Sequence, residues 1–356
     1  MLDEMATAGG DLIVAPDDDI ADDRDSALGD DTTSSTESMR SSILDYRHEN
    51  GRTYHRYKDG KYNFPNDDKE NERLDLEHHL CLATLDNKLG LSPPNLPDSK
   101  VKRVLDLGTG TGIWAIDFGD EHPDAEIIGV DLSPIQPDFI PPNVRFLIDD
   151  IDEDWDYSEP FDYIHSRMMN FSVQNWTDYL RKIFQNLAPG GYVELLEVDG
   201  FLMSDDGTLT EDHALWKWCK LLREAAGKLG RPYEQTDKFK NIMAEVGFTD
   251  VVEARFKWPT NRWPYLGIDK KYKALGTWNN ENTSLFLESA TLAPFTRGLG
   301  WSKEEVHVFL VDVRKDLNDP KIHAYSPICS VYGRKPEASG NSSDGCDAWP
   351  ATINQC

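Results

Sequence analysis

The sequence predicts an α/β fold in which a mostly parallel β-sheet carries helices on both faces. Between residues 101 and 258, short apolar runs typical of strands alternate with amphipathic runs typical of helices. The first of these strands also leads through a glycine-rich turn directly into a helix. With 356 residues, of which 39% are hydrophobic, the chain is long enough to bury a sizeable core.

The alternation can be followed along the chain, element by element. Apolar runs predict strands at residues 101–107, 126–130, 144–148, 161–165, 192–198, 251–258 and 323–332. Helical spacing of apolar residues predicts helices at residues 113–121, 176–187, 213–229, 237–246 and 303–317. We assign this α/β domain to residues 99–335, with a Trp- and Pro-rich insertion at about 259–300.

Three further segments flank this domain. Residues 1–40 are predicted to be a disordered acidic tail, because the first 38 residues carry twelve acids and one base, Arg24. Residues 41–98 are predicted to be a cap or lid, with a helix that begins after Asp67 and ends near Gly90. Residues 336–356 are Gly- and Ser-rich and are predicted to be a flexible tail.

Composition argues against several classes of protein. The net charge of −27 argues against direct nucleic-acid binding, which requires clustered Lys and Arg. No run approaches the roughly 18 apolar residues of a membrane span, and the N-terminus lacks a basic, apolar signal sequence. The five cysteines are scattered without CxxC spacing, as expected for reduced thiols. We therefore expect a cytoplasmic or nuclear protein without a membrane or metal site.

The strongest local signal is the turn after the first strand, residues 106–112 (DLGTGTG). Gly108, Gly110 and Gly112 allow the backbone to turn sharply and to approach a ligand closely, and Thr109 lies between them. Asp106 precedes the first glycine by two residues, where its carboxylate can meet a cationic amino group and would repel a pyrophosphate.

Acids also follow the next two strands. Asp131, followed by Leu132, ends the second strand, where a carboxylate can accept hydrogen bonds from both ribose hydroxyls. Asp150 follows the third strand, where it can accept from an adenine amino group while Ile151 packs on the ring. Acids for an amine, a ribose and an adenine, without a basic phosphate clamp, fit S-adenosyl-L-methionine better than a dinucleotide.

With this glycine loop, the acid after strand two and Pro-Gly-Gly before strand five, the chain resembles class I S-adenosylmethionine-dependent methyltransferases. That resemblance implies a Rossmann-like seven-stranded sheet whose last strand, 323–332, lies antiparallel beside the sixth. A closer resemblance, to the LaeA-like fungal methyltransferases, covers most of residues 46–265. It is carried by residues 50–57 (NGRTYHRY), 60–67 (GKYNFPND), 72–78, 112–115 (GIWA), 131–137 (DLSPIQP) and 161–164 (FDYI).

The resemblance also implies a biological setting. Members of this family act in fungal secondary metabolism and development, and some are nuclear regulators that associate with velvet-type proteins. The leading hypothesis is therefore a methyltransferase whose acceptor is a small metabolite or a protein. The alternative is a regulator that acts mainly as a nuclear scaffold with velvet-type partners. A nucleotide-dependent oxidoreductase is the third hypothesis, because such enzymes share the glycine-rich turn.

Candidate catalytic residues follow strands four and five: His165, Ser166 and Arg167 after strand four, and Glu197 and Asp199 after strand five. His165 has an unperturbed pKa near ~6.5 and can serve as a base, or it can be a structural hydrogen bonder. Arg167 can bind an acidic group of the substrate or pair with a nearby acid. A base is needed only if the acceptor loses a proton, because the sulfur leaving group departs neutral.

Aromatic residues outside the sheet supply candidate walls for the site. Tyr62 and Phe64 would shield the methyl donor from water if the cap folds over it; the cap can equally pack on the sheet edge. An acceptor pocket is expected in the insertion, although the same side chains can instead pack a subdomain or a partner surface. Its candidate residues are Trp258, Arg262, Trp263 and Trp278.

Overall fold

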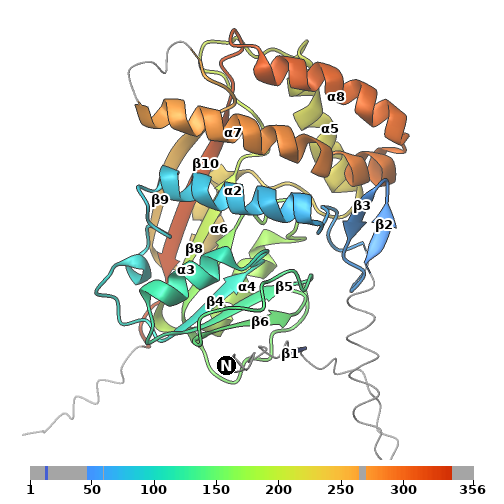
Figure 1. Ribbon diagram of the computed structural model, residues 1–356. Helices are drawn as coiled ribbons and strands as arrows, with labels where there is room; N and C mark the ends of the chain where they lie inside the picture. Colours follow the sequence, from blue (N-terminus) through green and yellow to red (C-terminus); the bar gives the residue numbers. More distant parts are fainter. Residues whose placement is uncertain (1–12, 15–45, 59, 264–269, 339–356) are drawn as a thin grey trace, which may run out of the picture.

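The computed structural model describes residues 13–14, 46–58, 60–263 and 270–338. In these residues an eight-stranded sheet forms the centre of the molecule (Figure 1). The strand order is β1-β6-β5-β4-β7-β8-β10-β9. The strands are β1 (Ile13–Val14), β4 (Arg103–Leu107), β5 (Glu126–Asp131), β6 (Val144–Ile148), β7 (Phe161–Arg167), β8 (Leu187–Val198), β9 (Thr249–Pro259) and β10 (Tyr325–Arg334).

The predicted antiparallel last strand is confirmed. β10 lies between β8 and β9 and runs antiparallel to both, with Ile328 opposite Val198 on one side and Phe256 on the other. The central strands β6, β5, β4, β7 and β8 pair in parallel. Their carboxyl ends therefore meet at one edge of the sheet, where ligands of open α/β sheets bind.

Helices cover both faces of the sheet, as predicted. On one face Val104 of β4 packs with Trp114 and Phe118 of α3 (Ile113–Glu121). On the other face Leu105 packs with α4 (Trp176–Asn186) and α6 (Phe239–Val246). Because successive strand residues point to opposite faces, neighbouring residues of β4 contribute to two separate cores.

The N-terminal segment caps the sheet with one long helix. α2 (Asp68–Thr84) begins after Asp67, whose carboxylate accepts a hydrogen bond from the backbone N–H of Glu70. Arg52 holds the same carboxylate through two hydrogen bonds, of 2.5 and 2.8 Å. Arg52 lies in β3 (Arg52–Tyr54), which pairs with β2 (Arg47–Glu49), so the small hairpin is attached to the start of α2.

The predicted insertion is largely helical. It contains α7 (Lys270–Ser289) and a π-helix at Pro294–Leu299, and α7 packs side by side with α2 (Figure 1). α5 (Ala214–Lys228) and α8 (Lys303–Asn318) pack with the π-helix around a second apolar core, which lies above the sheet. These helices form a roof over the carboxyl edge of the strands.

Several predicted bounds differ from the structure. β8 begins at Leu187, five residues earlier than predicted, because Leu187 already pairs with Phe161 of β7; the register then shifts across the Pro-Gly-Gly segment before Tyr192 pairs with Tyr163. Two residues of the predicted acidic tail, Ile13 and Val14, pair with β6, and the rest of residues 1–40 lies outside the described residues. The C-terminal tail is described only to residue 338. No helix in the described ranges has the length and apolar character needed to cross a membrane.

Candidate active site

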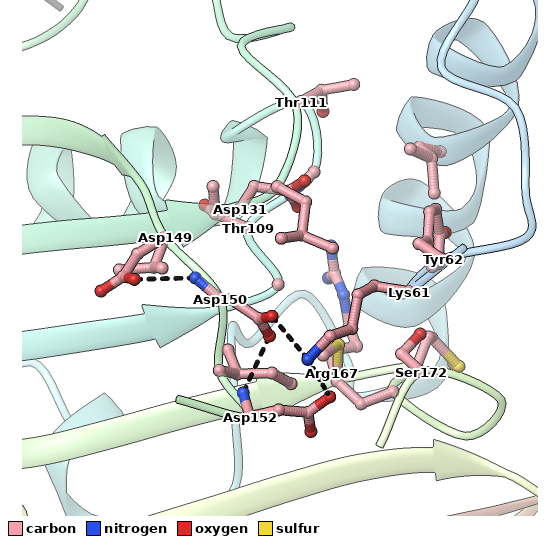
Figure 2. A pocket seen from close by; sticks show the side chains of 18 of the residues that line it. Lys61, Tyr62, Thr109, Thr111, Asp131, Asp149, Asp150, Asp152, Arg167 and Ser172 are labelled. Atoms are coloured by element: carbon pink, nitrogen blue, oxygen red, sulfur yellow. Dashed lines mark hydrogen bonds and ion pairs between the residues drawn. The ribbon is translucent and has the colours of Figure 1, made fainter. Parts of the chain in front are cut away.

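A cavity at the carboxyl edge of β4, β5, β6 and β7 encloses about 900 Å³, part of it open to solvent (Figure 2). Eight of the predicted site residues line it: Gly108, Thr109, Gly110, Asp131, Leu132, Asp150, Ile151 and Arg167. The cap contributes Lys61, Tyr62, Leu74 and Glu77 to the same wall. Most of the residues predicted for the site therefore meet at one location, and the cap covers that location.

The glycine loop has the backbone conformation that the sequence predicts. Gly108, Gly110 and Gly112 have φ values of +67°, +57° and +80°, in the left-handed region that side chains disfavour. Gly112 does not line the cavity; it is the N-cap residue of α3, and a Cβ there would clash with the ring of Phe146. A Cβ on Gly108 would clash with the sulfur of Met169.

Asp131 connects the end of β5 to this loop. One carboxylate oxygen accepts from the backbone N–H of Gly110 at 2.9 Å, and the other accepts from that of Ser133 at 3.0 Å. Burial raises the pKa of the Asp131 carboxyl to about 6, against the lowering effect of these backbone amides. Each oxygen keeps acceptor capacity for a ligand, because a carboxylate oxygen can accept two hydrogen bonds.

Asp150 forms the far end of the cavity. Its side chain is 2% exposed, and Oδ1 accepts from the backbone N–H of Asp152. Oδ2 forms an ion pair with Lys61 at 2.8 Å (Figure 2). Arg231 in turn pairs with Asp152 at 2.5 Å. Two of the three cations that line the cavity are thus neutralised by neighbouring acids.

Asp106 and His165 lie behind the loop, outside the cavity lining. Asp106 is 3% exposed, and its oxygens accept from the Thr109 hydroxyl at 2.6 Å and bond His165 Nδ1 at 2.7 Å. His165 is 1% exposed, and its ring stacks on Trp114 with the centroids 3.7 Å apart. Residues 104 and 106 of β4 face α3, and this alternation turns the Asp106 side chain away from the cavity. This placement favours the structural role for His165 over the role of a base.

Arg167 faces the cavity and is held by a neutral partner. Its guanidinium donates to Nδ1 of His78 at 3.1 Å, and Nε2 of His78 donates to Asp117 at 2.8 Å. Burial, and to a smaller extent Arg167, lower the pKa of His78, so this imidazole is neutral near pH 7. Within the described ranges no carboxylate pairs with Arg167, and its positive charge is available to a ligand.

A second cavity of about 850 Å³, part of it open to solvent, lies next to the first, beneath α2, α5 and α7. Both cavities share four lining residues: Tyr62, Leu74, Glu77 and Met168. Six aromatic residues line the second cavity: Tyr62, Phe64, Phe171, Trp218, Trp258 and Phe286. The strand ends and the cap line the first cavity, and helices α2, α5 and α7 contribute much of the lining of the second.

Of the four residues predicted to form an acceptor pocket, one lines the second cavity. Trp258 lines the second cavity, whereas Arg262 bonds Thr277 and Trp263 packs near His323. Trp278 is 47% exposed. The remaining aromatic walls come from the cap, the segment after β7, and helices α5 and α7.

Comparison with known proteins agrees with this architecture. A protein-family model described as a methyltransferase domain matches residues 76–253, half of the chain. The chain is 40% identical to "Methyltransferase pytC" of Aspergillus terreus over 86% of this chain and 93% of that protein. It is 37% identical to "Secondary metabolism regulator LAE1" of Cochliobolus heterostrophus over 81% and 94%. The chain belongs to the LaeA-like fungal methyltransferase family.

Among solved structures, this LaeA-like methyltransferase is similar to phosphoethanolamine N-methyltransferase 2 of Haemonchus contortus. The TM-score is 0.42 and the identity 17%, over 75% of this chain and 53% of that chain.

Sequence reasoning missed several residues that line the cavities of this LaeA-like methyltransferase. Lys61 and Glu77 come from the cap and Arg231 from the segment after α5, all distant in sequence from the glycine loop. Met168 and Met169 follow the strand that carries His165 and Arg167. The positive φ of Met168, 56°, marks a special backbone there, but a methionine gives no sign of it in the sequence.

Proposed function

We propose that this enzyme transfers a methyl group from S-adenosyl-L-methionine to a small aromatic metabolite in fungal secondary metabolism. The observation that carries the proposal is the pair of cavities that meet at Tyr62, Leu74, Glu77 and Met168. One cavity has the acids for an adenosine, and the other has the aromatic walls for an acceptor. The names of the relatives, a methyltransferase and a secondary metabolism regulator, support the same conclusion.

The residues of the first cavity fit S-adenosylmethionine. Asp131 would accept from the ribose hydroxyls, while Asp150 and Ile151 would take the adenine after Lys61 releases Asp150 Oδ2. The left-handed backbone at Gly108 and Gly110 leaves room for a close approach of the ligand. When bound, the cofactor supplies an electrophilic methyl group on a sulfonium.

The charges of this cavity favour an amino acid over a pyrophosphate. Lys61 and Arg231 are paired with acids, which leaves Arg167 as the cation for a single carboxylate. We assign Arg167 to the carboxylate of the methionine part. Asp106 and His165 would support the loop from behind, through the Thr109 hydroxyl and the stacked Trp114.

A recessed acceptor site beneath three helices favours a small molecule over a protein side chain. The second cavity lies under three helices and is bounded by aromatic rings, which supply large apolar contact area to a flat molecule. Rate enhancement would come mostly from holding the acceptor in line with the methyl group and excluding water, and the shared lining suits both tasks.

Calorimetric titration with S-adenosylhomocysteine and, separately, with NAD tests the cofactor assignment. We expect saturable binding of S-adenosylhomocysteine and no heat with NAD. Binding of NAD without binding of S-adenosylhomocysteine would favour the oxidoreductase hypothesis and refute the proposal.

The regulatory alternative is tested in cells. The relative named a secondary metabolism regulator motivates it, and velvet-type partners and a nuclear or cytoplasmic location stay predictions. If the double variant Gly108→Ala, Gly110→Ala fully complements a deletion strain, the cellular role does not require the cofactor.

A further inference from the structure

Glu77 is the one carboxylate that lines both cavities within the described part of the chain. We propose that Glu77 binds the acceptor's nucleophile through its O–H or N–H and takes its proton, and that the acceptor is an uncharged aromatic molecule. This inference rests on the proposed methyl transfer, and it names a base that the sequence did not indicate.

The Glu77 carboxylate is oriented by buried neighbours. Oε1 accepts from Arg73 Nη1 at 3.1 Å and from Asn282 Nδ2 at 3.5 Å. Arg73 is 4% exposed and is itself held by Glu70 at 2.7 Å and by the ring of Phe286. Fixing the long Glu77 side chain in this way reduces the entropy lost when a ligand binds.

The second oxygen of Glu77 is free to act. Among the described residues no hydrogen bond or ion pair reaches Oε2, although the side chain is only 14% exposed. A carboxylate oxygen that is sheltered from bulk water and lacks a protein donor is a strong acceptor for a ligand hydroxyl or amine. Its position at the junction of the cavities is where the methyl donor and the acceptor must meet.

The other titratable groups of the second cavity are less suited to the task. Asp199 already accepts from the hydroxyls of Tyr233 and Thr236. Burial raises the pKa of the Cys219 thiol to about 12 and also raises the pKa of Tyr62, so both stay protonated near pH 7. No histidine of the described ranges lines either cavity.

The charge of the second cavity sets the class of acceptor. The positive charge of Arg73 is offset by Glu70 and Glu77, and Asp199 adds a further acid to the wall. An anionic acceptor would therefore be repelled, whereas an uncharged aromatic ring with one hydrogen-bond donor finds apolar walls and a single strong acceptor.

The chemical step balances without a further reactant. The acceptor's O–H or N–H bond breaks, and its proton goes to Oε2 of Glu77. The electron pair left on the heteroatom forms the bond to the methyl carbon. The bond between that carbon and sulfur breaks, and its electron pair stays on sulfur as a neutral thioether.

The test measures binding, so the natural acceptor need not be known. The full chain, loaded with S-adenosylhomocysteine, is dialysed to equilibrium against 2-naphthol, 2-methoxynaphthalene or 2-naphthoate at pH 7. The three probes share one ring system and differ in having a donor, no donor or a negative charge. A hydrogen bond to a charged group is worth about 1.5–3 kcal/mol, so we expect 2-naphthol to bind at least about tenfold more tightly than either other probe.

Glu77→Gln then tests the residue itself. The amide oxygen of the variant can still accept from Arg73, which turns the NH₂ group toward the cavity in place of Oε2. We expect the preference for 2-naphthol over 2-methoxynaphthalene to disappear in the variant loaded with S-adenosylhomocysteine; a variant that keeps this preference overturns the inference. Glu72→Gln, an exposed position on the same helix, is the matched control and should keep the preference.

The outcomes separate this inference from the proposed function. Failure of the wild type to bind S-adenosylhomocysteine overturns the proposed function. Normal binding of S-adenosylhomocysteine with no preference for 2-naphthol in the wild type overturns the Glu77 inference alone, whether or not the variant folds. If Glu77→Gln weakens S-adenosylhomocysteine but keeps the preference for 2-naphthol, Glu77 belongs to the cofactor site and the inference is wrong.

Discussion

Replacing Asp131 by Asn should abolish most of the affinity for S-adenosylhomocysteine. The two carboxylate oxygens already accept from Gly110 and Ser133, at 2.9 and 3.0 Å, which aims their remaining lone pairs into the cavity. Asn keeps the shape of the side chain but loses the charge, and it replaces one acceptor by an NH₂ group. That group faces a backbone N–H and cannot bond to it.

The expected magnitude follows from the two hydrogen bonds to the ribose. Each hydrogen bond to a charged group contributes about 1.5–3 kcal/mol. The variant loses one of the two and keeps the other only as a weaker bond to a neutral amide, which together removes about 2–4 kcal/mol. At about 1.4 kcal/mol for each factor of ten, the dissociation constant should rise by roughly 30- to 10³-fold. Isothermal titration calorimetry at pH 7.5 measures the change, and Asp124→Asn, at an exposed position just before the same strand, is the control.

The pH dependence gives a second, independent check. Because burial raises the pKa of Asp131 to about 6, its carboxylate is ionised at pH 7.5 and becomes protonated as the pH falls through 6. The affinity of the wild type should therefore be constant above pH 7 and fall toward tenfold per pH unit below 6. In the variant the affinity should not fall below pH 6. A loss of affinity of less than fivefold in the variant, or the same fall in affinity at acid pH in both proteins, would refute the assignment of Asp131 to the ribose.

Three further predictions concern the loop, the carboxylate site and the core. Gly108→Ala combines a positive φ with a clash against the end of the buried Met169 side chain, which must change conformation. It should lower the free energy of unfolding by about 0.5–1.5 kcal/mol more than Gly230→Ala, which has a similar φ and open space around it. Equal losses in urea titrations would contradict the clash. Arg167→Met should weaken the binding of S-adenosylhomocysteine about 10-fold or more in calorimetry. The affinity for methylthioadenosine, which lacks the amino-acid part, should not change. Equal weakening of both affinities would exclude a contact between Arg167 and the carboxylate. Burial raises the pKa of Glu197 to about 8, so its carboxyl ionises at a lower pH in the unfolded chain than in the folded protein. The wild type should therefore lose about 1.4 kcal/mol of stability per pH unit between about pH 5 and 8 relative to Glu197→Gln, as measured by urea unfolding. Parallel pH profiles of the two proteins would contradict a raised pKa.

Features encoded over a few neighbouring residues were predictable. Apolar runs mark strands because a buried parallel strand must be apolar on both faces, and this identified the strands whose carboxyl ends line the first cavity. Glycines mark the loop because only they adopt its φ values without strain. The polar residues directly after each strand were also correctly brought together, since parallel strands end at the same edge.

The direction of side chains within the site was harder to predict from the sequence than the position of the strands and the loop. Asp106 and Asp131 both end strands and look equivalent in the sequence, yet one points behind the loop and the other into the cavity. His165 has the chemistry of a base, but strand alternation turns it onto Trp114. Whether a given side chain points into the cavity or behind the loop depends on the register and twist of strands that are far apart in the chain.

The sequence by itself determined the parallel sheet, the glycine loop and the acids beside it, because each depends on local spacing and backbone preference, and the family resemblance added the antiparallel last strand. Only the tertiary structure decided which residues form the second cavity, which we propose for the acceptor. Glu77, Trp218 and Phe286 lie on three helices separated by up to about two hundred residues, and they meet because those helices bury their apolar faces together over the sheet edge. Burial of apolar surface does not depend on sequence separation, so no local pattern in the sequence could predict that these three residues lie together.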